Sequence, residues 1–389
     1  MRNRVALLLV YIGIMKESRP GERRVAAIPA TVETFVSWKW NVLVQSGSGL
    51  EAGHTDESYK SAGAEIVESA GSAAEVDLVL RVGPPTPDDL DLLHKGSTVA
   101  GFLDPFVNDT VVRKLTDLGL TGLAVEAIPR TTLAQSMDAL SSQANIAGYA
   151  AALAAAQISP RLLPMMVTAA GTIPPSKAVI LGVGVAGLQA IATMRRLGAV
   201  VQAYDVRPET REQVESLGAK FIEAPTAEAD EGGYAREVGN DLQARQWEIL
   251  APYVADADLV ITTAQVPGRI APRLITSEMV DAMKPGSVII DMAAASGGNV
   301  EGSKPDQEID RNSVLICGPT NLAGAVPADA SRMYARNLVA LLERTRTDDG
   351  GISIDLEDDI IGPTAVVYRG EVRHPKCNEL LRIRTEGSS

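Results

Sequence analysis

Short apolar runs alternate with helix-like segments through the first third of the chain. Helices are predicted near residues 30–40 and 55–62. The apolar runs around them predict β-strands at 6–14, 41–45, 78–82, 97–102 and 122–126. Strands that alternate with helices form a parallel sheet covered by those helices, so this part of the chain is expected to be one α/β unit.

A second series of strand-like runs follows an alanine-rich segment, 145–157, which is expected to form a long helix. The expected strands are 179–181, 200–204, 259–262, 287–291 and 315–317. A helix over 328–344 would carry the chain back to the first unit. Two further apolar runs, 352–354 and 365–368 around Gly362 and Pro363, predict a β-hairpin appended to that unit.

The pattern therefore predicts an α/β protein with two Rossmann-like, doubly wound parallel-sheet domains around a cleft and a C-terminal β-hairpin. A length of 389 residues agrees with two domains, because a single hydrophobic core seldom grows that large. The expected first domain comprises 1–140 together with the returning segment 325–389. The expected second domain comprises 141–324.

Composition and charge narrow the class of protein. The formal net charge of −13, without a concentrated basic patch, argues against nucleic acid or an anionic lipid surface as a partner. Cys317 and Cys377 are too few for a disulfide framework, which indicates a reducing compartment. The apolar run 5–15 is too short to span a bilayer and is interpreted as the first strand, so no direct membrane insertion is expected.

A glycine-rich turn after the strand at 179–181 is the most informative motif. Gly182 allows a tight turn, Gly184 lets the backbone approach a pyrophosphate, and Gly187 lets the following helix pack close to the strand. Val185 and Ala186 lie at the start of that helix, whose N-terminus favours an anion. These residues are expected to bind a dinucleotide, although such a turn also occurs for packing reasons alone.

An acidic residue, Asp205, ends the next expected strand, at the distance at which dinucleotide-binding domains carry the acid that binds the adenosine ribose. A carboxylate there repels a 2′-phosphate, which favours NAD(H) over NADP(H). Arg207 stands two residues later and could instead pair with a 2′-phosphate. The other interpretation of Asp205 is a solvated residue at a strand end.

A polar segment at the junction of the two units carries Arg130, Gln135, Asp138 and Ser141. Its residues are candidates for a cleft, but Asp138 could also cap the following helix, and Arg130 with Asp138 could form a structural ion pair. The three histidines, His54, His94 and His374, stand beside no nucleotide-binding motif and lack metal-ligand spacing with the cysteines. Neither a metal site nor a catalytic histidine is expected.

Several longer strings show that the chain resembles the NAD(H)-binding component of proton-translocating nicotinamide nucleotide transhydrogenases, which are related to alanine dehydrogenases. The strings are residues 135–143, 164–172, 183–193, 215–221, 232–235 and 283–291. The resemblance covers most of the chain and implies the two-domain fold described above.

The resemblance also implies roles for individual residues. The segment with Arg130, Gln135, Asp138 and Ser141 would position the nicotinamide end of NAD(H), with the glutamine reaching toward a second nucleotide. The remaining implied contacts are Asp205, Val206 and Arg207 on the adenosine side, Gln265 on the nicotinamide side, and Gly233 with Tyr234 in a mobile loop that closes on bound nucleotide.

Alanine dehydrogenases share the opening pattern at 16–17 and 22–25, but two of their catalytic groups are missing here. Their catalytic histidine corresponds to Asp104 and their catalytic aspartate to Ala295. Hydride transfer between two nicotinamides neither releases nor accepts a proton at carbon, so a transhydrogenase can dispense with an acid and a base. The missing pair therefore favours transhydrogenation.

The resemblance predicts that NADH bound here passes hydride to NADP⁺ on a partner subunit, while a membrane subunit translocates protons. It implies a homodimer in the cytoplasm, held at the inner face of the membrane by membrane-spanning and NADP(H)-binding subunits. Two alternatives stay open: an amino-acid dehydrogenase like alanine dehydrogenase, and a non-catalytic NAD(H) sensor. The sensor would have no need for Arg130, Gln135 and Asp138 in one segment.

Overall fold

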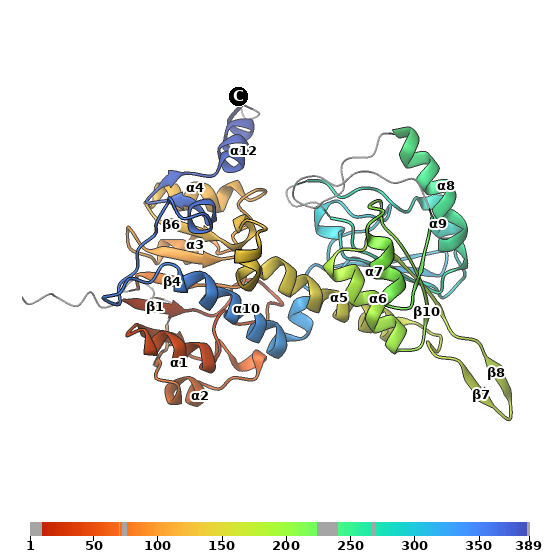
Figure 1. The fold of residues 1–389 in the computed structure, drawn as a ribbon, viewed down its shortest axis with the longest axis horizontal. Helices are drawn as coiled ribbons and strands as arrows, with labels where there is room; N and C mark the ends of the chain where they lie inside the picture. The colour runs from red at the N-terminus through yellow and green to blue at the C-terminus, as the bar shows by residue number, and fades with distance from the viewer. Residues whose placement is uncertain (1–9, 70, 72–75, 224–239, 266–268, 387–389) are drawn as a thin grey trace, which may run out of the picture. The chain divides into compact units, whose positions relative to one another are not determined.

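Residues 10–69, 71, 76–223, 240–265 and 269–386 are described by a computed structural model of the chain (Figure 1). They belong to two units. The first unit is formed by residues 1–143 and 324–389, and the second by residues 144–323. Each unit is built on its own β-sheet.

The first unit contains an eight-stranded sheet with the order β17-β16-β6-β5-β4-β1-β2-β3. The strands from β3 to β6 in this order run parallel. The bounds are β1 Tyr11–Ile14, β2 Asn41–Gln45, β3 Glu65–Val67, β4 Leu78–Leu80, β5 Thr98–Gly101, β6 Thr121–Ala124, β16 Ala365–Tyr368 and β17 Glu371–Val372. This is the doubly wound order that the sequence pattern predicts.

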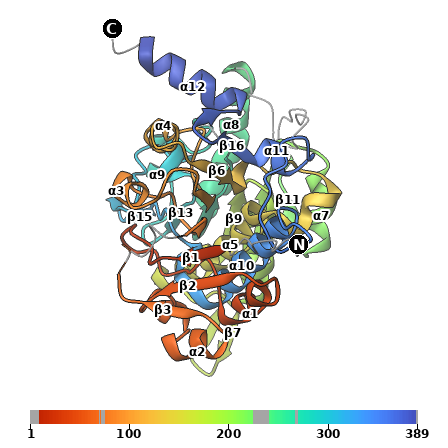
Figure 2. The same cartoon turned by 90° about the vertical axis from the view of Figure 1, so that its left-hand side faces the viewer.

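Helices pack on both faces of this sheet (Figure 2). Alternate residues of a strand point to opposite faces, so Leu78 and Leu80 join one core while Val79 joins another. The core with Leu78 includes Phe35 of α1 and Leu338 of α10. The helix bounds are α1 Pro29–Ser37, α2 Asp56–Ser61, α3 Pro87–Asp91, α4 Asp109–Asp117, α10 Pro327–Glu343, α11 Ile361–Thr364 and α12 Pro375–Glu386.

The C-terminal hairpin forms, but from other strands than the sequence pattern predicts. The expected pairing of 352–354 with 365–368 is wrong: β16 pairs with β17, and Ile352 bridges Arg346 instead. Arg369 and Gly370, with φ of 48° and 84°, make the two-residue turn that matches the twist of a β-hairpin. The expected turn at Gly362 lies in the short helix α11.

The second unit contains a seven-stranded sheet with the order β11-β10-β9-β12-β13-β15-β14. All neighbours are parallel except β14 and β15. The bounds are β9 Lys177–Leu181, β10 Val200–Tyr204, β11 Lys220–Phe221, β12 Leu259–Thr262, β13 Val288–Asp291, β14 Glu308–Arg311 and β15 Val314–Cys317. The two Rossmann-like parallel sheets of the prediction are thus confirmed.

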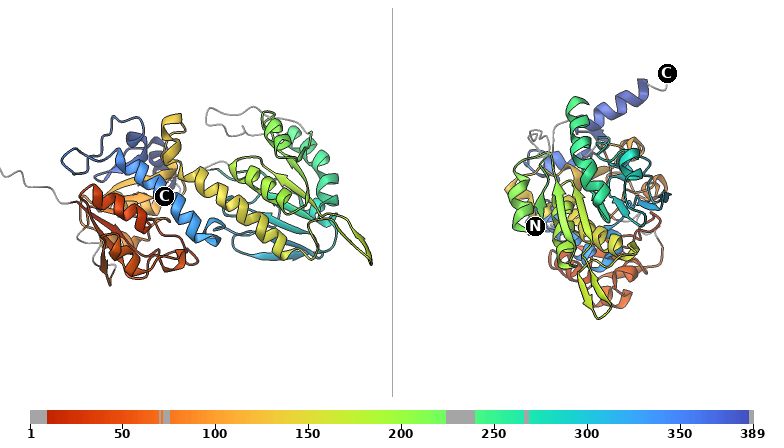
Figure 3. Two further views of the ribbon diagram at one scale, coloured as in Figure 1. Left: turned by 60° about the horizontal axis from the view of Figure 1, so that its bottom comes forward. Right: turned by 90° about the vertical axis from the view of Figure 1, so that its right-hand side faces the viewer.

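Two separate cores cover the faces of the second sheet (Figure 3). Ile180 and Ile261 pack with Ile191 of α6 in one core. Val179 and Val260 pack with the residues of α8 and α9 in the other. The helix bounds are α5 Ala139–Ile158, which begins in the first unit, α6 Val185–Arg196, α7 Thr210–Ser216, α8 Asn240–Asp256 and α9 Ser277–Asp281.

A separate two-stranded hairpin, β7 Met166–Thr168 and β8 Gly171–Ile173, projects from the second unit (Figure 3). Its side chains are exposed, including Val167 at 70% and Met166 at 41%. The sequence pattern did not predict it. In the part of the chain that the structure describes, no helix is both long enough and apolar enough to span a bilayer.

Candidate functional site

The glycine-rich turn joins β9 to α6, and two of its glycines are required by close packing. A Cβ on Gly182, where φ is +97°, would lie 2.8 Å from Ala264 N and Thr263 Oγ1. A Cβ on Gly187 would lie 2.0 Å from the carbonyl oxygen of Gly182. In contrast, no heavy atom stands within 4 Å of a Cβ placed on Gly184. The turn is closed behind Gly182 and Gly187 and open at Gly184, where a ligand can approach the backbone.

Helix α6 begins directly at this open position. Its N-cap is Gly184, which has no side chain to satisfy the first N–H groups of the helix. The N–H groups of the first turn, which include Val185, Ala186 and Gly187, have no acceptor within the helix. Uncapped donors and the helix dipole together suit a phosphate group, so the turn fits the pyrophosphate of a dinucleotide.

Asp205 follows β10 and contacts the same turn, because its Oδ2 accepts a hydrogen bond of 2.7 Å from Val183 N. Both carboxylate oxygens also pair with Arg207: Oδ1 accepts from its backbone N and Nε at 2.9 Å, and Oδ2 accepts from Nη2 at 3.0 Å. Asp205 is only 6% exposed. These four bonds use both oxygens of the carboxylate, so any further donor would have to share Asp205 with Arg207.

The interpretation of Asp205 as a solvated residue is therefore wrong. The sequence offered Asp205 and Arg207 as alternative contacts for the ribose or a 2′-phosphate, whereas in the structure the two residues form an ion pair. Arg207 Nη2 donates a further hydrogen bond to Val183 O, so the guanidinium also braces the glycine turn. Val206 packs at the edge of the core that contains Tyr204.

Replacing Asp205 with asparagine is expected to narrow the preference for NADH over NADPH by about tenfold, because the repulsion of a 2′-phosphate by a nearly buried carboxylate is lost. The measurement is the dissociation constant of each nucleotide, by titration, for wild type and variant. Equal constants for NADH and NADPH in the wild type would refute the role of Asp205.

The residues that follow the neighbouring strand β12 lie at the same carboxyl edge of the sheet as the glycine-rich turn. Thr263 Oγ1 donates to Gly182 O at 2.9 Å, and Gln265, which is exposed, donates through Nε2 to Met292 O. The ends of parallel strands at their carboxyl edge are where α/β sheets bind ligands. Gly182, Asp205 and Gln265 are thus gathered at one edge of the second unit. Gly233 and Tyr234 lie outside the described residues.

The polar segment predicted as a candidate site lies in the first unit, around the short helix η4 Thr132–Met137. Asp138 accepts hydrogen bonds from Ser141 N at 2.8 Å and Ser141 Oγ at 2.5 Å, so it caps the start of α5. Capping was one of the two structural alternatives for Asp138. Arg130 and Gln135 are exposed and are therefore accessible to a ligand.

Two asparagines that the sequence did not single out hold these segments in place. Asn337 of α10 donates to Ser136 O at 2.7 Å and accepts from Ser142 Oγ at 2.7 Å, and so ties the residue that follows Gln135 to the first turn of α5. Asn299 binds Ala264 in the second unit. Each acts over a long sequence separation and within no local motif, so no sequence signal pointed to them.

The two positions that distinguish this chain from alanine dehydrogenases lie in different units. Ala295 is part of the short helix η5 Ala294–Ser296 in the second unit. Asp104 has a left-handed backbone with φ of 50°, and its N–H donates to Glu126 Oε1 at 2.7 Å. All three histidines of the chain belong to the first unit. Among the described residues no cluster of His, Cys, Asp or Glu could hold a metal ion.

Glu126 carries a carboxyl oxygen, Oε2, that is buried without a hydrogen-bond partner among the described residues. Burial, followed by the charge of Asp104, raises the pKa of Glu126 to about 8. The folded protein therefore retains a proton on Glu126 at pH values at which the unfolded chain has released it.

Between about pH 4.5 and 8 this difference lowers the free energy of unfolding as pH rises. Glu126→Gln has no titrating carboxyl and therefore lacks this pH dependence. The free energy of unfolding of the variant, minus that of the wild type, should rise by about 3 kcal/mol from pH 5 to pH 9. The measurement is urea unfolding at several pH values, with the exposed Glu57→Gln as control. Parallel pH profiles for Glu126→Gln and wild type would contradict the assignment.

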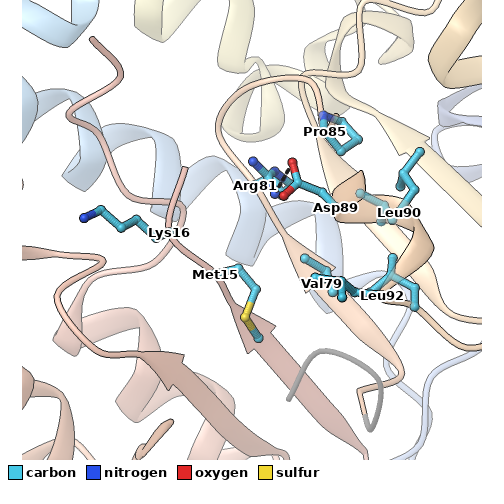
Figure 4. A pocket seen from close by; sticks show the side chains of 10 residues that line it. Met15, Lys16, Val79, Arg81, Pro85, Asp89, Leu90 and Leu92 are labelled. Atoms are coloured by element: carbon cyan, nitrogen blue, oxygen red, sulfur yellow. Dashed lines mark ion pairs between the residues drawn. The ribbon is translucent and has the colours of Figure 1, made fainter. Parts of the chain in front are cut away.

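The first unit contains a small pocket that is lined by none of the candidate site residues (Figure 4). Its volume of about 20 Å³ accommodates roughly one water molecule. Arg81, only 3% exposed, pairs there with Asp89 at 3.1 Å, while the Lys16 side chain points away from that pair. Arg81 also donates to Ser18 Oγ at 2.9 Å. The pocket is a structural junction between β4 and α3.

Fold and site together define a Rossmann-type nucleotide-binding protein, with a glycine-rich turn at Gly182 to Gly187 and an acid at Asp205. The chain belongs to the alanine dehydrogenase/PNT family: the N-terminal domain of that family matches residues 13–147 and its C-terminal domain matches residues 151–375.

Within the family, the relatives separate into two groups. The first part of NAD(P) transhydrogenase subunit alpha from Rhodospirillum rubrum is 44% identical over 375 residues, which are 94% of this chain and 98% of that protein. The transhydrogenase structure from Sinorhizobium meliloti has a TM-score of 0.85 at 44% identity and covers 93% of this chain and 99% of that one. Alanine dehydrogenase of Bacillus subtilis is 30% identical over 326 residues, 82% of this chain and 81% of that protein. The resemblance to transhydrogenase components is confirmed, and alanine dehydrogenases are more distant.

Proposed function

We propose that this chain is the NAD(H)-binding component of a proton-translocating transhydrogenase. NADH held by the second unit would give hydride directly to NADP⁺ on a partner subunit, and a separate membrane subunit would couple the reaction to proton translocation. The 44% identity to a transhydrogenase subunit over 94% of the chain supports this assignment.

The observation that carries the proposal is the absence of an acid–base pair where the alanine dehydrogenase resemblance predicts one. Ala295 has no titratable group, and Asp104 stands where a histidine is expected. Asp104 therefore offers a carboxyl in place of the imidazole, and its N–H is bound to Glu126. An amino-acid dehydrogenase needs a group that moves a proton together with hydride, whereas transhydrogenation does not.

The task left to the protein is positioning. Direct hydride transfer requires the two nicotinamide rings at a near-attack distance of about 3–3.5 Å, and correct placement supplies most of the rate. In this proposal the N–H groups of α6 hold the pyrophosphate and Asp205 holds the adenosine ribose. Arg130, Gln135 and Asp138, with Ser141, place the nicotinamide end, and Gln265 contributes from the second unit.

The proposal also extends to assembly. The chain would act as a homodimer in the cytoplasm, bound at the inner face of the membrane through NADP(H)-binding and membrane-spanning subunits. The name of the Rhodospirillum rubrum relative, as one portion of a subunit alpha, describes a protein that works with further polypeptides. This supports a multi-subunit assembly for the present chain.

The test combines the purified chain with the NADP(H)-binding subunit, NADPH, and an NAD⁺ analogue whose reduced form has its own absorbance. Reduction of the analogue that requires both proteins is the expected result. A parallel reaction with alanine and NAD⁺ separates the alternatives: alanine-dependent NADH formation would favour the dehydrogenase. NADH binding without either reaction would favour the sensor.

A further inference from the structure

Asn299 occupies a central position beside the carboxyl edge of the second sheet. It is completely buried, and it follows Gly297 and Gly298, whose φ angles of 98° and 77° turn the chain back toward β13. Its backbone N–H donates to Asp291 Oδ1 at 3.3 Å, and its carbonyl oxygen accepts from Leu274 N at 2.8 Å. The backbone of Asn299 is therefore fixed from two directions.

The side-chain amide of Asn299 binds both backbone polar groups of one residue, Ala264, and the carbonyl of a second, Pro272. Its Oδ1 accepts a hydrogen bond of 3.0 Å from Ala264 N, and its Nδ2 donates one of 2.9 Å to Ala264 O. The second Nδ2 hydrogen goes to Pro272 O at 2.7 Å. Both amide hydrogens and the oxygen are thus used, and a buried amide with every group paired is costly to alter.

Ala264 packs against the phosphate turn and immediately precedes Gln265 in the chain. On one side its N atom stands 2.8 Å from the position of a Cβ on Gly182, which is why that position must be glycine. On the other side it precedes Gln265 directly. A displacement of Ala264 would therefore change the placement of Gln265 relative to the phosphate turn, while Thr263 Oγ1 still holds Gly182 O.

We infer that Asn299 is a positioning residue of the dinucleotide site, which holds the backbone of Ala264 so that the Gln265 segment stays in register with the Gly182 turn. The inference rests on the proposed function, because it takes the nucleotide to lie along this edge with its nicotinamide half toward Gln265. Asn299 itself touches no ligand in this assignment.

Asn299→Asp is the most specific test, because aspartate has nearly the same shape. It keeps an acceptor for Ala264 N but turns an oxygen toward Ala264 O and Pro272 O, where asparagine offers two donors. Asn299→Ser removes the whole side-chain amide without adding charge and is the test if the aspartate variant does not fold. The matched control is Ser287→Ala, which loses one buried hydrogen bond, to Ala257 O, just before β13 begins.

Two measurements on the whole chain distinguish a role of Asn299 in positioning the nucleotide site from a role in the overall stability of the fold. In nucleotide-free protein, amide exchange of a peptide covering 259–265 should become at least about tenfold faster in the Asn299 variants and stay unchanged in Ser287→Ala. The dissociation constant of NADH should rise about tenfold, while that of AMP, which lacks the nicotinamide half, should change by less than about twofold.

Unchanged exchange in this peptide, or equal weakening of NADH and AMP, would overturn the inference. A wild-type chain that does not bind NADH would overturn it together with the proposed function. Normal NADH binding without hydride transfer to the NADP(H)-binding partner would count against the proposed function alone.

Discussion

Replacing Gln135 with asparagine is expected to slow hydride transfer about a hundredfold while changing the NADH dissociation constant by less than about threefold. The side chain is exposed within η4, and the backbone of the next residue is fixed by the hydrogen bond from Asn337 to Ser136 O. A shorter side chain on a fixed backbone withdraws its amide by roughly 1 Å, and misplacement on that scale costs about two orders of magnitude in rate.

Single-turnover reaction with the NADP⁺-loaded partner gives the rate, and equilibrium titration of the same variant gives NADH binding. Gln157→Asn, at an exposed position of α5, is the matched control and should alter neither quantity. An unchanged rate with weakened NADH binding would reverse the assignment and make Gln135 a ground-state contact only.

Gly187→Ala is expected to destabilise the fold and Gly184→Ala is not, although both are expected to weaken NADH binding. A Cβ at Gly187 meets Gly182 O at 2.0 Å, and backbone cannot move aside cheaply, so Gly187→Ala should lower the free energy of unfolding by about 1–3 kcal/mol. A Cβ at Gly184 meets nothing within 4 Å, so Gly184→Ala should fold with near wild-type stability. Both should weaken NADH binding tenfold or more, because a methyl group at Gly184 occupies the approach of the pyrophosphate and a shifted turn at Gly187 misplaces it.

Thermal unfolding and NADH titration of the two variants test this pair together. Gly184→Ala is the more informative variant, because weaker NADH binding by a protein of near wild-type stability cannot be attributed to a damaged fold. Wild-type NADH affinity in Gly184→Ala would mean that the pyrophosphate does not lie over this turn. The proposed site would then have to be abandoned.

The elements of this fold that the sequence predicted are those encoded locally. The buried strands β9, β10, β12 and β13 are continuous apolar runs, and the turn at Gly182 has its own short motif. Strand β14 was missed because it is a polar edge strand, Glu308–Arg311, with an alternating exposed pattern. The C-terminal hairpin departs from the prediction because Gly362-Pro363, a strong local turn signal, lies in the short helix α11, and the turn forms at Arg369-Gly370 instead.

The supporting residues of the candidate site could not be predicted, because their partners are distant in sequence. Asn299 and Ala264 are 35 residues apart, and Asn337 and Ser136 are 201 apart. Even the neighbours Asp205 and Arg207 were ambiguous: the sequence placed both near a ribose, and only the structure pairs them. Composition and periodicity report burial, whereas these contacts depend on which loops the completed sheet brings together.

The central claim is direct hydride transfer without proton exchange, and an isotope label tests it most directly. NADH carrying deuterium at C4, on the face from which hydride departs, is mixed with the chain and the NADP⁺-loaded partner subunit in ordinary water. Direct transfer predicts that the deuterium is recovered in full in NADPH. Loss of the label to solvent, or NADPH that forms only when an amino or oxo acid is added, would contradict it.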